Sequence, residues 1–305
     1  MNVEWMRGCA TALVTPFGKD GSVDLERARA LAGRQVEGGV RVLVPCGTTG
    51  ESATLSAAER EAVIAAAVEV ARGRARVLAG TGSNSTAHAA EQSRRAAELG
   101  ADAVLVVAPY YNKPTQEGLY RHFRAVAEAV PETPVVLYNV PGRTSSNITA
   151  ATTLRLARDC PNVVAVKEAS GDLAQVMEIL RSRPEGFLVL SGDDALTLAL
   201  AALGADGLIS VASNEAPELV SRMVEGALAG RWDEARELHY RLLPLMDANF
   251  VESNPGPVKA ALALMGLLEE NLRLPLVPVT EETRERVRGA LAGLGLLEGK
   301  THVAA

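Results

Sequence analysis

Eight short apolar segments, rich in β-branched residues, recur along the first two thirds of the chain and constrain its fold more than any other feature. They start about every 20 to 35 residues, the length of one strand, loop and helix. Each is almost continuously apolar, which is typical of parallel strands covered on both faces. Eight such units predict an α/β fold, a (β/α)8 TIM barrel; a doubly wound sheet is the alternative, although it more often has fewer strands. The segments are Cys9–Val14, Val40–Val44, Arg76–Ala79, Ala103–Val107, Val135–Tyr138, Val163–Val166, Phe187–Leu190 and Gly207–Val211.

The segments between these strands have helical periodicity and begin at capping residues. Ser56 with Glu59 three residues later forms a capping box, and Gly100 is placed to end the helix that starts at Ser85. The predicted helices are Ser56–Arg72, Ser85–Leu99, Thr115–Val130, Thr149–Asp159 and Asp193–Leu203.

The pattern changes after Gly226, where no further strand is predicted. Helical segments at Arg231–Phe250, Pro257–Leu268 and Thr280–Leu294 are joined at prolines. No linker rich in Gly and Ser separates them from the barrel. We therefore expect a catalytic barrel domain over residues 1–225 and a C-terminal helical region over 226–305 that packs on it.

Composition excludes several classes of protein and cofactor. The 305 residues are 48% hydrophobic and carry a net charge of −6 without a basic cluster, which argues against nucleic-acid and membrane-surface binding. No signal peptide is visible, and no apolar run approaches the roughly 18 residues of a membrane span, so we expect a cytoplasmic protein. Three scattered cysteines, four histidines without ligand spacing and the absence of a glycine-rich nucleotide motif predict no metal and no cofactor.

Barrel enzymes carry their active sites at the C-terminal ends of the strands, and Lys167 is the most informative residue there. Only five residues are lysines, and Lys167 is the one that ends an apolar strand. Burial disfavours the charged form of an amine, and a neutral amine can attack a ketone to form a Schiff base. The alternative is a structural ion pair with a carboxylate such as Glu168; alternation along a strand argues against it because adjacent side chains point to opposite faces.

Other strand ends supply groups that fit this chemistry. Tyr138 ends the neighbouring strand, where a phenol could move protons, although it could equally be a core aromatic. Thr48 and Thr49 lie between two glycines and could hold a carboxylate; a simple turn or a phosphate loop are the alternatives. Arg143 could bind a carboxylate through two hydrogen bonds, or be one of many surface arginines.

Taken together, these motifs resemble the dihydrodipicolinate synthase family, which lies in the N-acetylneuraminate lyase superfamily of Schiff-base class I aldolases. The resemblance extends from about residue 7 to about residue 295. The matching segments are 47–52, 108–118, 138–144, 166–169, 191–194 and 252–259.

The resemblance implies an activity and roles for single residues. The family condenses pyruvate with aspartate-4-semialdehyde in the first committed step toward diaminopimelate and lysine. Lys167 would form the Schiff base, and Tyr138, Thr49 and Tyr111 would form a proton relay, with Tyr111 serving the site of a neighbouring subunit. Thr48 and the Thr49 backbone would bind the pyruvate carboxylate, Arg143 the semialdehyde carboxylate, and the backbone of Gly192 and Ile209 would line the pocket. The family also suggests a homotetramer built from two dimers.

One region departs from the family pattern. Lysine-inhibited members bind lysine at positions that match Ser52, Ala53, Asn84 and Tyr110, together with an acidic residue and two histidines. Here the acidic position is His88, and the histidine positions are Ala57 and Arg60. The loss of the carboxylate removes charge complementarity to the lysine amine, so we expect weak or absent inhibition by lysine.

Three hypotheses about function follow. The first is the synthase. The second is a sibling lyase or dehydratase that acts on sialic acid or a 2-keto-3-deoxy sugar acid; it would share Lys167 and Tyr138, but such enzymes usually lack an arginine at position 143. The third is a barrel that binds a ligand without turnover, which the complete set of competent side chains argues against.

Overall fold

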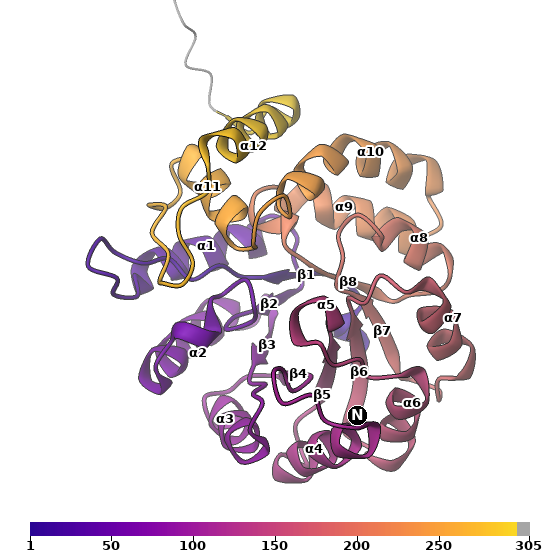
Figure 1. Cartoon of the computed structure of the whole chain (residues 1–305). Helices are drawn as coiled ribbons and strands as arrows, with labels where there is room; N and C mark the ends of the chain where they lie inside the picture. The colour runs from indigo at the N-terminus through magenta and orange to yellow at the C-terminus, as the bar shows by residue number, and fades with distance from the viewer. Residues whose placement is uncertain (298–305) are drawn as a thin grey trace, which may run out of the picture.

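The chain folds into a closed barrel of eight parallel strands (Figure 1), as the repeating apolar segments predict. The computed structural model describes residues 1–297. The strands pair in chain order and β8 closes against β1. Their bounds are β1 Gly8–Ala12, β2 Val42–Val44, β3 Arg76–Gly80, β4 Ala103–Val107, β5 Val135–Asn139, β6 Val163–Glu168, β7 Leu188–Ser191 and β8 Gly207–Ser210.

Alternate residues of each strand fill two different cores. On β5, Val136 and Tyr138 belong to the cluster inside the barrel, whereas Val135 and Leu137 belong to the cluster between the strands and the helices. Both faces are therefore buried, which explains why the strands read as continuous apolar runs. Tyr138 is the last residue of β5 in the inner cluster. Because side chains alternate between the two faces of a strand, its phenol lies inside the barrel at the C-terminal mouth.

Helices surround the barrel and follow the strands in sequence. The bounds are α1 Leu25–Glu37, α2 Ala57–Ala71, α3 Thr86–Glu98, α4 Gln116–Ala129, α5 Pro141–Thr144, α6 Ala150–Asp159, α7 Leu173–Ser182, α8 Thr197–Ala202 and α9 Pro217–Leu228, with short 3-10 turns η1 Glu4–Met6, η2 Ser52–Thr54 and η3 Ala212–Asn214. The capping box of Ser56 and Glu59 is present, and Ser85, Thr115 and Thr149 cap their helices as predicted. Gly100 follows the end of α3 with a φ of 92°, a left-handed conformation that favours glycine.

The helix after β7 begins later than predicted. The prediction was Asp193, but α8 starts at Thr197. Asp194 is fully buried, and its carboxylate accepts hydrogen bonds from Ser210 Oγ and from the backbone N–H groups of Val211 and Ala212. This side chain ties the β7 loop to the end of β8 instead of capping a helix.

The C-terminal helices α10 Trp232–Ala248, α11 Gly256–Leu264 and α12 Glu281–Leu294 gather beside α9 and α1 (Figure 1). Buried residues of α10 and α12, such as Leu242 and Leu291, belong to the same cluster that covers the outside of the strands. The predicted boundary at residue 226 falls inside α9, and residues 298–305 of the predicted region lie outside the described part of the chain. Within residues 1–297, no helix is both long and apolar enough to cross a bilayer.

The three cysteines are buried and free, as expected for small core residues. Burial raises the pKa of the Cys9 and Cys46 thiols to about 12. Both side chains are therefore protonated and unreactive at neutral pH.

Candidate active site

A cavity of about 130 Å³ opens at the C-terminal ends of the strands, where the barrel fold predicts the active site. It collects six of the residues that the sequence singled out, from the ends of four strands: Thr48, Thr49, Tyr138, Arg143, Lys167 and Gly192. The other lining residues are Val140, Ala169, Asp193, Val211, Phe250 and Asn254. Residues up to 206 positions apart in the sequence, from Thr48 to Asn254, thus share one small space.

Lys167 and Tyr138 lie side by side on neighbouring strands. They pair directly in the register of β5 and β6, and the Lys167 Nζ lies 4.2 Å from the centre of the Tyr138 ring. Both side chains are about 5% exposed, so the amine faces an aromatic surface rather than bulk water. A buried amine that lines a cavity next to a phenol can attack a carbonyl carbon while the phenol transfers protons.

Glu168 is not the partner of Lys167. Its carboxylate points to the other side of the strand, where it accepts hydrogen bonds from Asn139 Nδ2, Gln175 Nε2 and the Ser170 N–H. The alternative of a Lys167–Glu168 ion pair is therefore wrong. The physical reason is the strand geometry that the sequence already indicated, with successive side chains on opposite faces.

Gly192 leaves the space that the lysine side chain occupies. A Cβ at this position would lie 2.8 Å from Lys167 Cε and 2.7 Å from the Ala169 Cβ, closer than carbon atoms pack. Position 192, directly after β7, must therefore be glycine for the Lys167 side chain to adopt its observed position. Gly192 also lines the cavity, as the family resemblance implied.

Neighbouring segments of the chain pack closely against the Thr48–Thr49 turn and hold it in place. Thr49 is 2% exposed, and the following Gly50 carbonyl accepts a hydrogen bond from Thr15 Oγ1 at 2.7 Å. A Cβ on Gly80 would lie 2.2 Å from the Cys46 carbonyl oxygen. Only a glycine at position 80 therefore allows the end of β3 to pack this closely against the turn. The turn also contains Glu51 in a left-handed conformation with a φ of 52°. Such a conformation costs about 1 kcal/mol or more for a residue other than glycine and needs support from its surroundings.

A buried ion pair supplies part of that support. Glu51 Oε1 accepts a hydrogen bond from Lys259 Nζ at 2.6 Å, and both side chains are at most 1% exposed. The ammonium also donates to the Thr15 carbonyl and lies 4.3 Å from the centre of the Phe17 ring. Burial lowers the pKa of Lys259, and the Glu51 carboxylate beside it opposes that shift. Lys259 thus fixes the C-terminal helix α11 to the threonine turn, a role that its place in a helical appendage did not predict.

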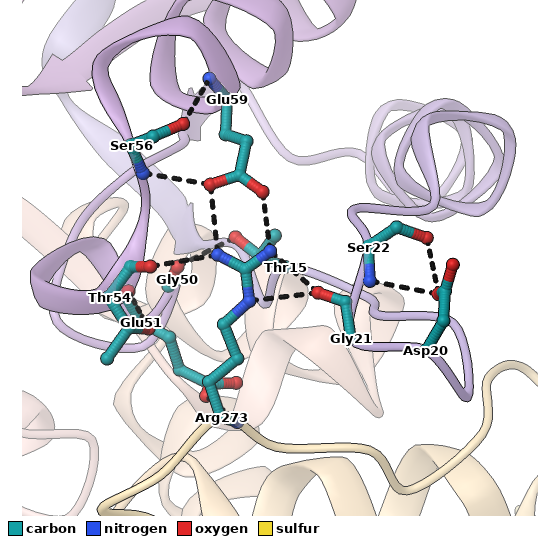
Figure 2. Close-up of polar contacts among 10 residues, drawn as sticks. All are labelled: Thr15, Asp20, Gly21, Ser22, Gly50, Glu51, Thr54, Ser56, Glu59 and Arg273. Atoms are coloured by element: carbon teal, nitrogen blue, oxygen red, sulfur yellow. Dashed lines mark hydrogen bonds and ion pairs between the residues drawn. The ribbon is translucent and has the colours of Figure 1, made fainter.

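Arg273 forms a second anchor on the same turn (Figure 2). Its guanidinium pairs with both carboxylate oxygens of Glu59 and donates to the carbonyls of Thr54 and Gly21. Its backbone N–H donates to the free oxygen of Glu51. The guanidinium holds the pKa of Glu59 at about 2. The loop between α11 and α12 therefore fastens η2, the start of α2 and the β1–α1 loop together.

Arg143 lies at the mouth of the cavity on the short helix α5. Its Nη2 donates to the Asn254 carbonyl oxygen at 3.3 Å, and its side chain is exposed. A guanidinium that lines the cavity from the solvent side can receive a substrate carboxylate as the substrate enters.

Three predicted residues lie away from the cavity. Tyr111 is 90% exposed with a φ of 74°, and Tyr110 beside it is 38% exposed. Ile209 packs inside the barrel with Tyr138 but is not among the lining residues, whereas Val211 two positions later is. Within one chain, therefore, neither tyrosine of the pair reaches Lys167.

The positions matched to lysine binding are divided between two places. His88, Ala57 and Arg60 line a groove of about 150 Å³ between α2 and α3, where the His88 Nε2 lies 2.6 Å from Gln92 Nε2. Ser52, Ala53, Asn84 and Tyr110 do not line this groove. The Asn84 carbonyl instead accepts a hydrogen bond from Asn112 Nδ2. The Arg60 guanidinium donates to the Gly80 carbonyl, and burial lowers its pKa.

Sequence reasoning missed two side chains from the C-terminal region, Phe250 and Asn254, which close one side of the cavity. Asn254 stands in one of the segments that match the family, and that was the available signal. Its position beside Thr49 could not be derived, because it depends on how the region folds back over the barrel.

Comparison with known proteins agrees with this geometry. The family model of the "Dihydrodipicolinate synthetase family" matches residues 5–293. The 4-hydroxy-tetrahydrodipicolinate synthase of Koribacter versatilis is 57% identical over 297 residues, which cover 97% of this chain and 98% of that protein.

Solved structures show the same similarity. Dihydrodipicolinate synthase from Aquifex aeolicus superimposes with a TM-score of 0.94 at 45% identity, over 96% of this chain and all of that one. The chloride-inhibited enzyme from Acinetobacter baumannii, solved with pyruvate, gives a TM-score of 0.93 at 45% identity, again over 96% of this chain and 100% of the other. The fold, the cavity and these similarities lead to one conclusion: the chain belongs to the dihydrodipicolinate synthetase family.

Proposed function

We propose that this chain condenses pyruvate with L-aspartate-4-semialdehyde to give 4-hydroxy-tetrahydrodipicolinate, the first committed step toward diaminopimelate and lysine. The observation that carries the proposal is the buried Lys167 amine against the Tyr138 ring, in a cavity with two threonines on one side and Arg143 at its mouth. Two threonine hydroxyls and an arginine around the amine suit a small keto acid and a second substrate that carries a carboxylate. The protein's close relatives carry the name of this activity.

The proposed reaction begins at Lys167. The neutral amine attacks the ketone carbon of pyruvate, and the resulting carbinolamine loses water to form an imine. Thr48 and the Thr49 backbone bind the pyruvate carboxylate, and Tyr138 donates the proton with which the hydroxyl leaves. Loss of a methyl proton then gives an enamine, the carbon nucleophile.

The second half of the reaction joins the substrates. The enamine carbon attacks the aldehyde carbon of the semialdehyde, whose oxygen takes up a proton and becomes the 4-hydroxyl. Arg143 holds the semialdehyde carboxylate by two charge-assisted hydrogen bonds. The substrate amine then displaces Lys167 from the imine, which closes the ring and regenerates the free enzyme. One water is released overall.

We propose that Tyr111 completes the proton relay of a neighbouring subunit. Its exposure of 90% and its left-handed backbone fit a side chain that is held away from its own chain and is covered by another. A dimer is then the minimum active unit, and a tetramer of two dimers is the expected assembly. A cytoplasmic location stays a prediction from sequence.

The experiment that tests the activity traps the Schiff base. The protein is incubated with pyruvate, reduced with borohydride and weighed, and the modified peptide is sequenced. We expect one reduced pyruvate on Lys167 in wild type, none in Lys167→Ala, and an unchanged result for the exposed control Lys19→Arg. No adduct, or an adduct on another lysine, contradicts the proposal.

Two further measurements complete the test. Consumption of aspartate semialdehyde distinguishes the synthase from a sibling lyase, which would form the same adduct but leave the semialdehyde untouched. Mixing inactive Lys167→Ala with inactive Tyr111→Phe tests the shared relay, because a mixed dimer has one site with both residues intact. Partial recovery of activity is expected on mixing; no recovery contradicts the contribution of Tyr111 to a neighbour.

A further inference from the structure

Asn254 brings the C-terminal region into contact with the proposed proton relay. The residue follows α10 and precedes α11, is 5% exposed and lines the cavity. Its side-chain Nδ2 donates to Thr49 Oγ1 at 3.0 Å, and its carbonyl oxygen accepts from Arg143 Nη2 at 3.3 Å. One residue therefore contacts both the threonine turn and the arginine at the mouth.

The direction of the bond between Asn254 and Thr49 has a chemical consequence. An amide nitrogen can only donate, so the threonine oxygen is the acceptor in this pair. A hydroxyl has one proton, and accepting from Asn254 leaves that proton available for a different acceptor. Within the described residues, no acceptor engages the Thr49 hydroxyl, and the Tyr138 phenol lines the same cavity.

We infer that Asn254 is a positioning residue that sets the direction of proton flow in the relay. With one of its lone pairs occupied by the amide, the Thr49 hydroxyl donates its proton toward the Tyr138 oxygen, and the Tyr138 proton is then directed at the substrate. Tyr138 gives its proton to the carbinolamine hydroxyl, which leaves as water, and takes the Thr49 proton in exchange. The methyl proton released when the enamine forms returns to the relay and restores the Thr49 hydroxyl. This inference rests on the proposed function, since it assigns a part to the same site.

Asn254→Asp reverses the bond with almost no change in shape. A carboxylate only accepts, so the Thr49 hydroxyl must turn and donate to residue 254, which removes it from Tyr138. We expect kcat to fall about 100-fold, in the range of a lost proton-transfer contribution. The amount of borohydride-trapped pyruvate after long incubation stays unchanged, because the relay alters the rate of imine formation and not its equilibrium.

The Asp variant also has a pH signature that a merely structural residue would lack. A protonated carboxyl can donate to Thr49 and restore the original direction. The ratio of wild-type to variant kcat should therefore shrink as pH falls toward the pKa of the introduced carboxyl. Burial raises that pKa, and the cationic groups of Arg143 and Lys167, which line the same cavity, lower it. Asn254→Leu, which has a similar shape without a donor, should lose kcat equally at every pH. Ser253→Ala, an exposed neighbour, is the control.

A second assay needs only pyruvate. Exchange of the pyruvate methyl protons for deuterium, followed by NMR, reports imine and enamine formation without the semialdehyde. If wild type exchanges the pyruvate methyl protons but does not consume aspartate semialdehyde, the proposed function is wrong. The effect of Asn254 on the exchange rate can still be measured in that case. If wild type forms no pyruvate adduct, both proposals are wrong. If Asn254→Leu keeps wild-type kcat and exchange, or if the Asp and Leu variants share one pH profile, the inference about Asn254 is overturned.

Discussion

Replacing Lys259 by Met tests how strongly the buried ion pair holds the threonine turn. The substitution keeps most of the side-chain length but removes the charge. Glu51, whose side chain is 1% exposed, would then keep only the N–H of Arg273 as a partner for its carboxylate. Leaving one member of such a pair buried and unpaired costs about 3–5 kcal/mol in the free energy of unfolding. For a chain of this size that corresponds to a fall of roughly 5–10 °C in the apparent Tm.

A double-mutant cycle separates the pair from its surroundings. Glu51→Gln together with Lys259→Met removes both charges, so no charge is left uncompensated. We expect the double variant to be about 2–3 kcal/mol more stable than the sum of the single losses predicts. Lys19→Met, at an exposed position, is the control for losing a lysine.

Urea denaturation followed by circular dichroism measures these differences, at one protomer concentration because assembly shifts apparent stability. The activity should fall in Lys259→Met even at temperatures where it is folded, since the turn carrying Thr49 has lost its support. A loss below about 1 kcal/mol for Lys259→Met, or strict additivity in the cycle, would refute the reasoning.

Three other outcomes follow from the structure. Gly192→Ala should fold but lose the borohydride-trapped pyruvate, because the new methyl group would lie 2.8 Å from Lys167 Cε; an unchanged adduct yield contradicts the steric role of this glycine. Lysine at millimolar concentration should leave the rate at saturating pyruvate nearly unchanged, because His88 matches the position at which the family resemblance implies a lysine-binding carboxylate; half-inhibition would show that expectation to be wrong. Because Arg273 lowers the pKa of Glu59 to about 2 in the folded state, their interaction stabilises the protein above the ordinary glutamate pKa of about 4.5 and is lost as pH falls from there to about 2. The destabilisation caused by Glu59→Gln should therefore shrink over that window in pH-dependent urea titrations, and a constant difference would contradict the assigned pKa.

The order of the strands and most of the cavity were predictable, and the reason is local. A strand buried on both faces must be apolar along its whole length, so the few polar residues at strand ends are conspicuous. Lys167, Tyr138 and Thr49 were identified in this way. The strand period also predicted that Glu168 faces away from Lys167, as its bonds to Asn139 and Gln175 now show.

Contacts between distant segments were not predictable in this way. Lys259 lies in a predicted helix of the C-terminal region, and its sequence neighbours do not show that it is fully buried against Glu51, 208 positions away in the chain. Asp193 was expected to start a helix, but the adjacent Asp194 turns inward to bind the end of β8. In both cases a charged side chain looks solvent-exposed by its local pattern, and only a partner from elsewhere makes its burial possible.

The amino-acid sequence by itself determined the barrel, the helices around it and the place of the reactive lysine, because each depends on the periodicity of neighbouring residues. The tertiary structure alone decided how the C-terminal region closes the site. The contacts of Lys259, Arg273 and Asn254 with the threonine turn join groups more than 200 residues apart. No local pattern encodes such a pair, because the free energy of a buried hydrogen bond depends on which groups the completed fold brings together and not on their separation along the chain.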